Sequence, residues 1–266
     1  MRTCVEGSKM EKKICDFLQQ RIWAVVGASN NPEKYGYRIY TLLGRYGYTV
    51  YPVNPREKEI GGQKCYTSLA DLPIKPDVVD FVVPPSVAAS VVRECSQLGI
   101  SRVWFQPGVD DDNVVRTTQQ LGLNFVHKTC AMVESSKRYM LGKHTWAIVG
   151  SGDGHEAKSI GDFLRDKGYT VHTVIPKPGA EALAQLPFTP DVLAIAADQF
   201  LAEAVLRECA ERGISYIWLQ SGYESEALIN LALSLQLTVV HHASVIDEYP
   251  SVTECKDGTW KTSIKK

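Results

Sequence analysis

The sequence predicts an α/β protein built from two tandem domains, each with a doubly wound parallel sheet. One observation is a repeat: VRECSQLGISRVWFQPGV, residues 92–109, returns as LRECAERGISYIWLQSGY, residues 206–223, and such self-similarity marks a duplicated structural unit. The other is that short apolar runs of strand length alternate with segments of helical periodicity. That alternation is typical of parallel sheets with crossover helices.

The elements of the first copy follow from these patterns. We expect strands over residues 22–27, 48–53, 78–83, 101–105 and 123–126. The helices between them have apolar stripes made of Ile39, Leu42, Leu43 and Tyr46, of Val87, Val91, Val92, Cys95 and Leu98, and of Val114, Val115, Thr118 and Leu121. Five strands with helices on both faces indicate a Rossmann-like fold. The second copy repeats the stripes, so we expect it to retain the core.

The repeat also sets the expected domain boundaries. They are an N-terminal arm over 1–17, a first domain over 18–134, a polar linker over 135–144 that breaks both periodicities, a second domain over 145–249 and a tail over 250–266. The second copy lacks about two residues after its first strand and about seven after its second. We expect the two domains to pack as an intramolecular pseudo-dimer.

Composition excludes several classes of function. The 266 residues are 44% hydrophobic and 22% charged, with a net charge of −1, which is ordinary for a globular protein and lacks the basic excess that nucleic-acid binding requires. No apolar run reaches the roughly 18 residues of a membrane helix. We therefore expect a cytoplasmic protein without a membrane partner; lysines near Met10 leave organellar targeting open, but Glu6 and Glu11 disfavour it. The seven cysteines form no CxxC pair, so we expect reduced thiols and no bound metal.

The stretch WAVVGASNNPEKYGYRIYTLL, residues 23–43, runs a strand through a glycine loop into a helix. Ligands of open parallel sheets bind beyond the carboxyl ends of the strands. Gly27 allows close approach of a backbone, Ser29 and Asn30 supply small polar groups, and the helix N-terminus favours an anion. The loop predicts a phosphate site, with a ligand-free structural turn as the alternative.

The end of the second strand favours a phosphorylated ribose. A domain that binds NAD carries Asp or Glu there to hold the ribose hydroxyls, whereas this chain has Asn54, Arg56 and Lys58. Basic side chains suit NADP or the 3'-phosphate of coenzyme A. A solvated loop face, with Glu57 and Glu59 offsetting the charge, is the alternative.

Five segments of the first copy resemble the CoA-binding-domain family, small Rossmann-like proteins related to the nucleotide-binding domain of succinyl-CoA synthetase α-subunits. They are VGASNNP with YRIYTLL, GYTVYPVNP, GGQKCYTSLADLP followed by DVVDFVVPP, VWFQPGV, and HKTCAMVE. The resemblance covers most of the first copy. It implies that this domain binds coenzyme A or an acyl-CoA.

The resemblance also implies a set of binding residues. They are Gly27, Ala28, Ser29 and Asn30 at the diphosphate, Asn54, Pro55 and Arg56 near the adenosine, Val83, Pro84 and Pro85 as an apolar wall, and Phe105, Gln106 and Pro107 at the pantetheine arm. Relatives often have a serine and a basic residue at the start of the first helix, where Lys34 can substitute. Cys130 is implied to lie near the coenzyme thiol. A mixed disulfide would need a lowered thiol pKa; the alternative is a buried small hydrophobe.

The second copy is expected to have lost the ligand. Its loop GSGDGHEAK places Asp153 and Glu156 where phosphates would sit, and the segment GGQKCYTSL has no counterpart. Succinyl-CoA synthetases use a phosphorylated histidine, but that histidine belongs to a ligase domain with no match in this chain. Adjacent residues on a strand point to opposite faces, so we expect neither His241 nor His242 to be catalytic.

Three functions remain as alternatives. The sequence shows no Ser/His/Asp set, metal cluster, Walker loop or ligase domain, which favours a non-catalytic or accessory protein that binds coenzyme A or an acyl-CoA, with a structural second domain and a separate partner protein left open. An NADP-dependent oxidoreductase would need a separate substrate domain and is disfavoured. A ligand-free scaffold is the third alternative.

Overall fold

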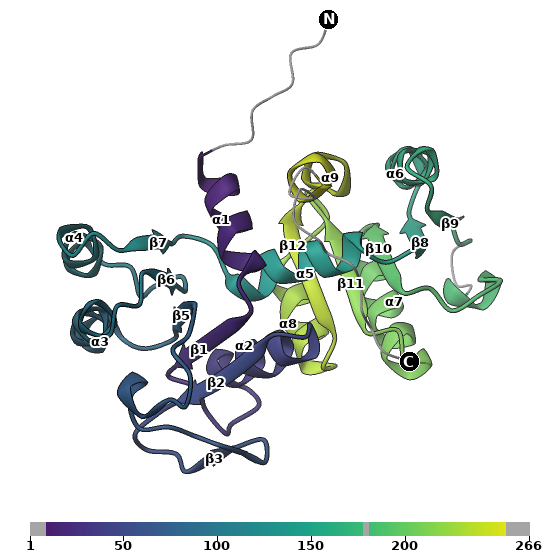
Figure 1. Cartoon of the computed structure of the whole chain (residues 1–266). Coiled ribbons are helices and arrows are strands. Elements are labelled where there is room, and N and C mark those ends of the chain that lie inside the picture. The colour runs from purple at the N-terminus through teal and green to yellow at the C-terminus, as the bar shows by residue number, and fades with distance from the viewer. Residues whose placement is uncertain (1–8, 178–180, 254–266) are drawn as a thin grey trace, which may run out of the picture. The chain divides into compact units, whose positions relative to one another are not determined.

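The computed structural model describes residues 9–177 and 181–253. The chain divides into two compact units, residues 1–135 and 136–266. Each unit contains a five-stranded sheet with helices on both faces (Figure 1). The predicted α/β fold with two Rossmann-like parallel sheets is therefore confirmed.

The sheet of the first unit has the strand order β2-β1-β5-β6-β7. Its strands are β1 (Ile22–Val26), β2 (Thr49–Val53), β5 (Val78–Phe81), β6 (Arg102–Phe105) and β7 (Asn124–Val126). Every neighbouring pair is parallel. This is the order 2-1-3-4-5 of flavodoxin-like sheets, in which ligands bind where the strand order reverses. That switch point lies between β1 and β5, below the Gly27 loop.

Helices cover both faces of this sheet (Figure 1). On one face, α3 (Pro85–Gln97) and α4 (Asp112–Gln120) pack over apolar side chains that include Val79, Phe81 and Val103. On the other face, α2 (Tyr35–Arg45) buries its predicted stripe. Two residues of the predicted stripes are exposed instead of buried: Val87, in the first turn of α3, is 44% exposed, and Leu121, directly after α4, is 37% exposed.

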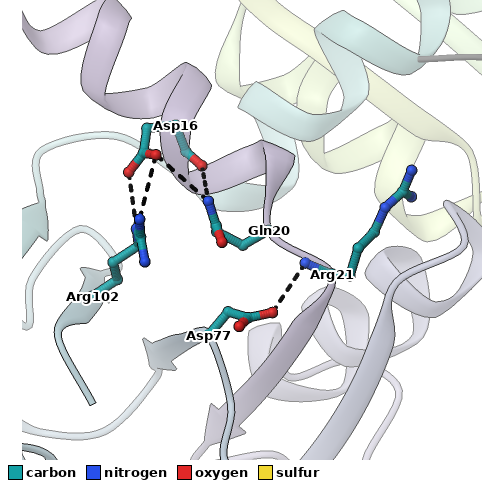
Figure 2. Close-up of polar contacts among 5 residues, drawn as sticks. All are labelled: Asp16, Gln20, Arg21, Asp77 and Arg102. Carbon is teal, nitrogen blue, oxygen red and sulfur yellow. Dashed lines mark hydrogen bonds and ion pairs between the residues drawn. The ribbon is translucent and has the colours of Figure 1, made fainter. Parts of the chain in front are cut away.

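The predicted N-terminal arm forms a packed helix, α1 (Lys9–Gln19). Phe17 is fully buried, with its ring edge-on to that of Trp104 at a centroid distance of 6.1 Å. Asp16 accepts a hydrogen bond from Arg102 Nε at 2.9 Å (Figure 2). Residues 1–8 of the arm lie outside the described residues. The described part of the arm thus helps to cover the sheet.

A recurring Pro-Asp dipeptide ties strands together at their amino ends. Figure 2 shows Asp77, before β5, with its carboxylate directed at the backbone of Arg21. Its Oδ2 accepts the N–H groups of Arg21 at 3.3 Å and Ile22 at 3.0 Å. In the second unit, Asp191 accepts the N–H of Thr145 at 3.1 Å. The dipeptide therefore has a structural role in both copies.

An antiparallel hairpin that the sequence patterns did not predict follows β2. It consists of β3 (Glu59–Ile60) and β4 (Gln63–Lys64), with Ile60 fully buried. A 3₁₀ turn, η1 (Leu69–Asp71), follows it. The turn and second strand of the hairpin lie in the segment GGQKCYTSL, which has no counterpart in the second copy.

The second unit has the same topology, with strand order β12-β11-β10-β8-β9. Its strands are β8 (Thr145–Gly150), β9 (Thr170–Val174), β10 (Val192–Ala196), β11 (Tyr216–Gln220) and β12 (Thr238–Ala243). Its helices are α6 (His155–Asp166), η2 (Leu183–Gln185), α7 (Gln199–Arg212), α8 (Glu226–Ser234) and α9 (Val245–Thr253). Helix α9 includes the start of the predicted tail, whose residues 254–266 lie outside the described residues.

The predicted linker is partly helical. Helix α5 (Ala131–Leu141) includes the first seven residues of the stretch 135–144. Ser135, Ser136 and Lys137 are buried polar residues on this helix. They separate its buried apolar residues at the two ends, which hides the helical period in the sequence.

The cysteines differ in their bonding. Cys65, Cys95, Cys130 and Cys209 are free, as expected. Cys15 is disulfide-bonded, which corrects the expectation of reduced thiols at that position.

None of the helices within residues 9–177 and 181–253 is long and apolar enough to span a membrane.

Candidate functional site

The predicted site residues all lie in loops at the carboxyl edge of the first sheet or at the ends of its strands. Gly27, Ala28, Ser29, Asn30 and Lys34 follow β1; Asn54, Pro55 and Arg56 follow β2; Val83, Pro84 and Pro85 follow β5; Phe105 ends β6, with Gln106 and Pro107 after it; and Cys130 precedes α5. The loops that follow β1, β2 and β5 contact one another beside the switch point between β1 and β5.

Gly27 allows three loops to converge. Its φ is +89°, a conformation that favours glycine. Its N–H donates to the carbonyl oxygen of Val53 at 2.9 Å. A Cβ on Gly27 would overlap the carbonyl oxygen of Val82 and lie 2.7 Å from Val83 Cγ1. The backbone after β1 is therefore pressed against the loop after β5.

The start of α2 lies directly on the Gly27 loop. A Cβ on Gly36 would overlap the carbonyl oxygen of Gly27. The residue preceding the helix, Lys34, makes no side-chain cap, and its carbonyl oxygen accepts the N–H of Tyr37 at 3.1 Å. The N–H groups of Tyr35 and Gly36 and the positive end of the helix can therefore serve an anion. Gly36 was not among the predicted site residues. A glycine in the first turn of a helix that follows a glycine loop is the signal that could have indicated it.

Asn54 joins the β1 and β2 loops. Its Nδ2 donates to the carbonyl oxygen of Ala28 at 2.7 Å, and its Oδ1 accepts the N–H of Arg56 at 2.9 Å. A carboxylate at this position could accept but not donate, which gives a structural reason for the missing acid. The side chain of Arg56 is exposed and makes no ion pair with the described part of the chain.

The small polar residues of the first loop hold the loop itself. Ser29 is buried, and its Oγ accepts the N–H of Asn31 at 3.2 Å. Asn30 Oδ1 accepts the N–H of Gly61, in the hairpin turn, at 3.4 Å. Ala28 is fully buried, and Lys34 is exposed. The hairpin is therefore attached to the side of the candidate site.

The residues assigned to the pantetheine arm differ in exposure. The ring of Phe105 is fully buried and packs edge-on against Phe81 at 5.1 Å, so its side chain belongs to the core and only its backbone can face a ligand. Pro107 and Pro84 are exposed. Val83 packs partly against the core, and Pro85 begins α3.

Gln106 is buried and contacts an acid that the sequence analysis missed. Its Nε2 donates to Asp80 Oδ1 at 2.6 Å. Asp80 lies in β5 and is fully buried, and burial raises its pKa to about 7. An acid in the middle of the apolar strand VVDFVV is the pattern that could have indicated it, because a charge inside an apolar strand is costly unless it has a purpose.

Cys130 is a protonated thiol at neutral pH. Burial raises its pKa to about 11, backbone N–H groups of Val133 and Met132 oppose that rise in part, and the charge of Asp80 adds to it. The nearby His127 faces Asp110, with 3.1 Å between Nδ1 and Oδ2. The pKa is raised, not lowered, which removes the basis for a mixed disulfide.

A separate cavity of about 480 Å³ lies beside β2, between α2 and the hairpin. Tyrosines line much of it, among them Tyr37, Tyr40 and Tyr51. It includes no predicted site residue. In the second unit Arg165, the counterpart of Gly44, donates to Thr173 Oγ1 at 3.1 Å beside the matching edge strand. The edge strand of the second unit is thus contacted by an arginine where the first copy has a glycine.

The start of α6 in the second unit is already occupied by acids. Asp153 Oδ1 accepts the N–H of His155 at 3.0 Å, and Glu156 Oε1 accepts Nε2 of Gln220 at 3.1 Å. These carboxylates sit at the helix N-terminus that an anionic ligand would need.

The two adjacent histidines do not point to opposite faces. Their rings meet edge-on at 4.8 Å, because His242 has a φ of +54° that interrupts the strand alternation. His242 Nδ1 lies 2.8 Å from Glu224 Oε1, and burial lowers the pKa of His241. The expectation from strand geometry was wrong here.

Comparison with known families decides the relationship. The model of the CoA binding domain matches residues 21–136 and again residues 144–250. The chain belongs to this CoA-binding domain family. The two matches correspond to the two copies of the sequence repeat.

Individual relatives match parts of the chain. The α-subunit of acetate–CoA ligase [ADP-forming] II from Pyrococcus furiosus is 41% identical over 88 residues, which are 33% of this chain and 19% of that subunit. The uncharacterized protein YneT from Bacillus subtilis is 26% identical over 47% of this chain and 93% of its own length. A solved conserved hypothetical protein from Pyrococcus furiosus is 44% identical, with a TM-score of 0.42, over 43% of this chain and 98% of its own. The chain thus spans about a fifth of the ligase subunit it matches.

Proposed function

We propose that the first unit binds coenzyme A or an acyl-CoA at the carboxyl edge of its sheet. The observation that carries the proposal is the uncapped start of α2, which lies on the Gly27 loop in a domain of the CoA-binding family. Phosphate groups bind such helix starts. Lys34 and Arg56 are exposed at this edge and add positive charge.

We infer an accessory, non-catalytic role with a second unit that is structural. The match to the acetate–CoA ligase α-subunit covers 19% of that subunit, and the second unit has acids at its helix start. Any acyl transfer would then depend on a separate partner protein. The ligand would be a coenzyme that the first unit holds for such a partner.

Calorimetry of the purified protein with coenzyme A, acetyl-CoA, NADP and ATP tests the proposal. Coenzyme A or acetyl-CoA should bind most tightly. Tighter binding of NADP would favour the oxidoreductase alternative instead. An absence of binding by all four compounds would favour a scaffold.

Arg56 provides a sharper test of the ribose phosphate. Arg56→Glu should weaken coenzyme A by about tenfold or more, because a charge-assisted hydrogen bond becomes a repulsion, and should leave dephospho-CoA nearly unchanged. Lys177, at the matching position of the second copy and also exposed, supplies the control Lys177→Glu. Equal losses for both ligands would rule out contact between Arg56 and the 3'-phosphate.

A further inference from the structure

Asp80 is a fully buried carboxyl group that reaches the candidate site through one side chain. Its Oδ1 accepts the 2.6 Å hydrogen bond from Gln106, and its Oδ2 has no hydrogen-bond partner in the described part of the chain. Across the sheet its neighbours are Val25 and Trp104. Buried polar atoms are nearly always paired, and a carboxylate in apolar surroundings is costly. The unpaired oxygen therefore needs an explanation.

The second unit shows that the fold does not require this acid. Gln220, the counterpart of Gln106, is also buried, but Ala194 stands in place of Asp80. There the glutamine Nε2 donates to Glu156 on α6, and its Oε1 accepts the N–H of Val245 at 3.1 Å. The same glutamine is thus held from the helix side in one copy and from within the sheet in the other. Only the copy with an open helix start carries the buried acid.

We propose that Asp80 is a positioning residue whose carboxylate fixes the direction of the Gln106 amide and thereby makes ligand affinity depend on pH. The part that concerns affinity rests on the proposed coenzyme site. With its nitrogen held by Asp80, Gln106 offers its carbonyl oxygen to an N–H donor, and the pantetheine arm contains two amide N–H groups. A protonated Asp80 donates as well as accepts, so either end of the amide can face it. Protonation of Asp80 therefore allows the Gln106 amide to adopt either of two orientations.

Among the groups around Asp80, the carboxyl group of Asp80 itself is the one whose protonation changes near neutral pH. Burial raises its pKa to about 7, and the hydrogen bond from Gln106 opposes the rise. Cys130, directly before α5, faces Asp80 with a thiol that stays protonated, and Glu134 on α5 is the other carboxylate that acts on this thiol. The helices α1 and α2 bury apolar and aromatic side chains on this face, and Asp16 of α1 is paired elsewhere. Titration near neutral pH at this position thus belongs to Asp80.

Nuclear magnetic resonance tests the pairing without any ligand. The side-chain amide signals of Gln106, assigned by their loss in Gln106→Leu, should shift with a midpoint near the pKa of about 7 in the wild type. They should not shift in Asp80→Asn, which is uncharged at every pH. Signals in the wild type that do not move through this range would overturn the proposal.

Calorimetry with coenzyme A tests the consequence for binding. Between about pH 6 and pH 8 wild-type affinity should rise by about three- to tenfold, the worth of one hydrogen bond. Asp80→Asn should lose this dependence, and Asp80→Ala, which copies Ala194, should bind weakly throughout. Asp77→Asn changes a carboxyl group at the other end of β5 and should keep the wild-type pH profile. Titration of the ligand's own phosphate affects every variant alike, so it cancels when the profile of Asp80→Asn is compared with that of the wild type.

The outcomes separate this inference from the proposed function. A wild type that binds no coenzyme A at either pH defeats the proposed function, and the amide titration then still decides the pairing. If the wild type binds coenzyme A and Asp80→Asn has the same pH profile, the proposed effect of Asp80 on affinity is wrong. The proposed binding of coenzyme A is then still supported.

Discussion

At the residue scale, Gly27 is the position where the first loop tolerates least change. Gly27→Ala should destabilise the protein by about 2 to 6 kcal/mol, since alanine is strained at positive φ and its Cβ overlaps the loop after β5. Gly47 has a similar φ of +87°, but no atom lies within 4 Å of the place that a Cβ would take. Chemical denaturation should therefore give only about 1 kcal/mol for Gly47→Ala. Equal costs for the two variants would contradict the close approach.

Asp80 should also make the free energy of unfolding depend on pH. Its pKa is raised to about 7 in the folded protein and is about 3.9 in an unfolded chain. The folded state therefore holds the proton more tightly. Stability relative to Asp80→Asn should be greatest below about pH 4, fall as the pH rises toward about 7 and then level off, a loss on the order of 4 kcal/mol. Urea unfolding of both proteins across this range measures it, and parallel curves would show that Asp80 does not titrate there.

At the scale of elements, α1 is an integral part of the first unit. Phe17→Ala should cost about 3 to 5 kcal/mol, because a fully buried ring is lost from its packing against Trp104. Asp16→Asn should cost less than about 1 kcal/mol, since the ion pair with Arg102 is partly exposed. Thermal unfolding distinguishes the two. A small effect of Phe17→Ala would mean that α1 is only loosely attached.

The elements that the sequence predicts are those with an apolar period. The strands and the stripe of α2 follow from burial of alternating or helically spaced side chains. The hairpin escaped prediction because two-residue strands are too short to show a period. Helix α5 escaped because Ser135 and Ser136 are buried on it. In the site, motif similarity indicated the loops, and the acid within the apolar run VVDFVV marks Asp80 as unusual. The contacts of Asn54 with Ala28 and of Asp80 with Gln106 could not be predicted, because they depend on side chains that meet across strands.

At the scale of the whole molecule, two copies of one topology present different carboxyl edges. The first has an uncapped helix start beside a basic strand end, and the second has Asp153 and Glu156 at the same place, with Ile175 in place of Asn54. Like charges at a helix start oppose phosphate binding. We therefore expect calorimetry to give one coenzyme A per chain, with Arg56→Glu lowering the affinity of that single site and Lys177→Glu leaving it unchanged. A stoichiometry of two would show that the acids of the second copy do not exclude the ligand.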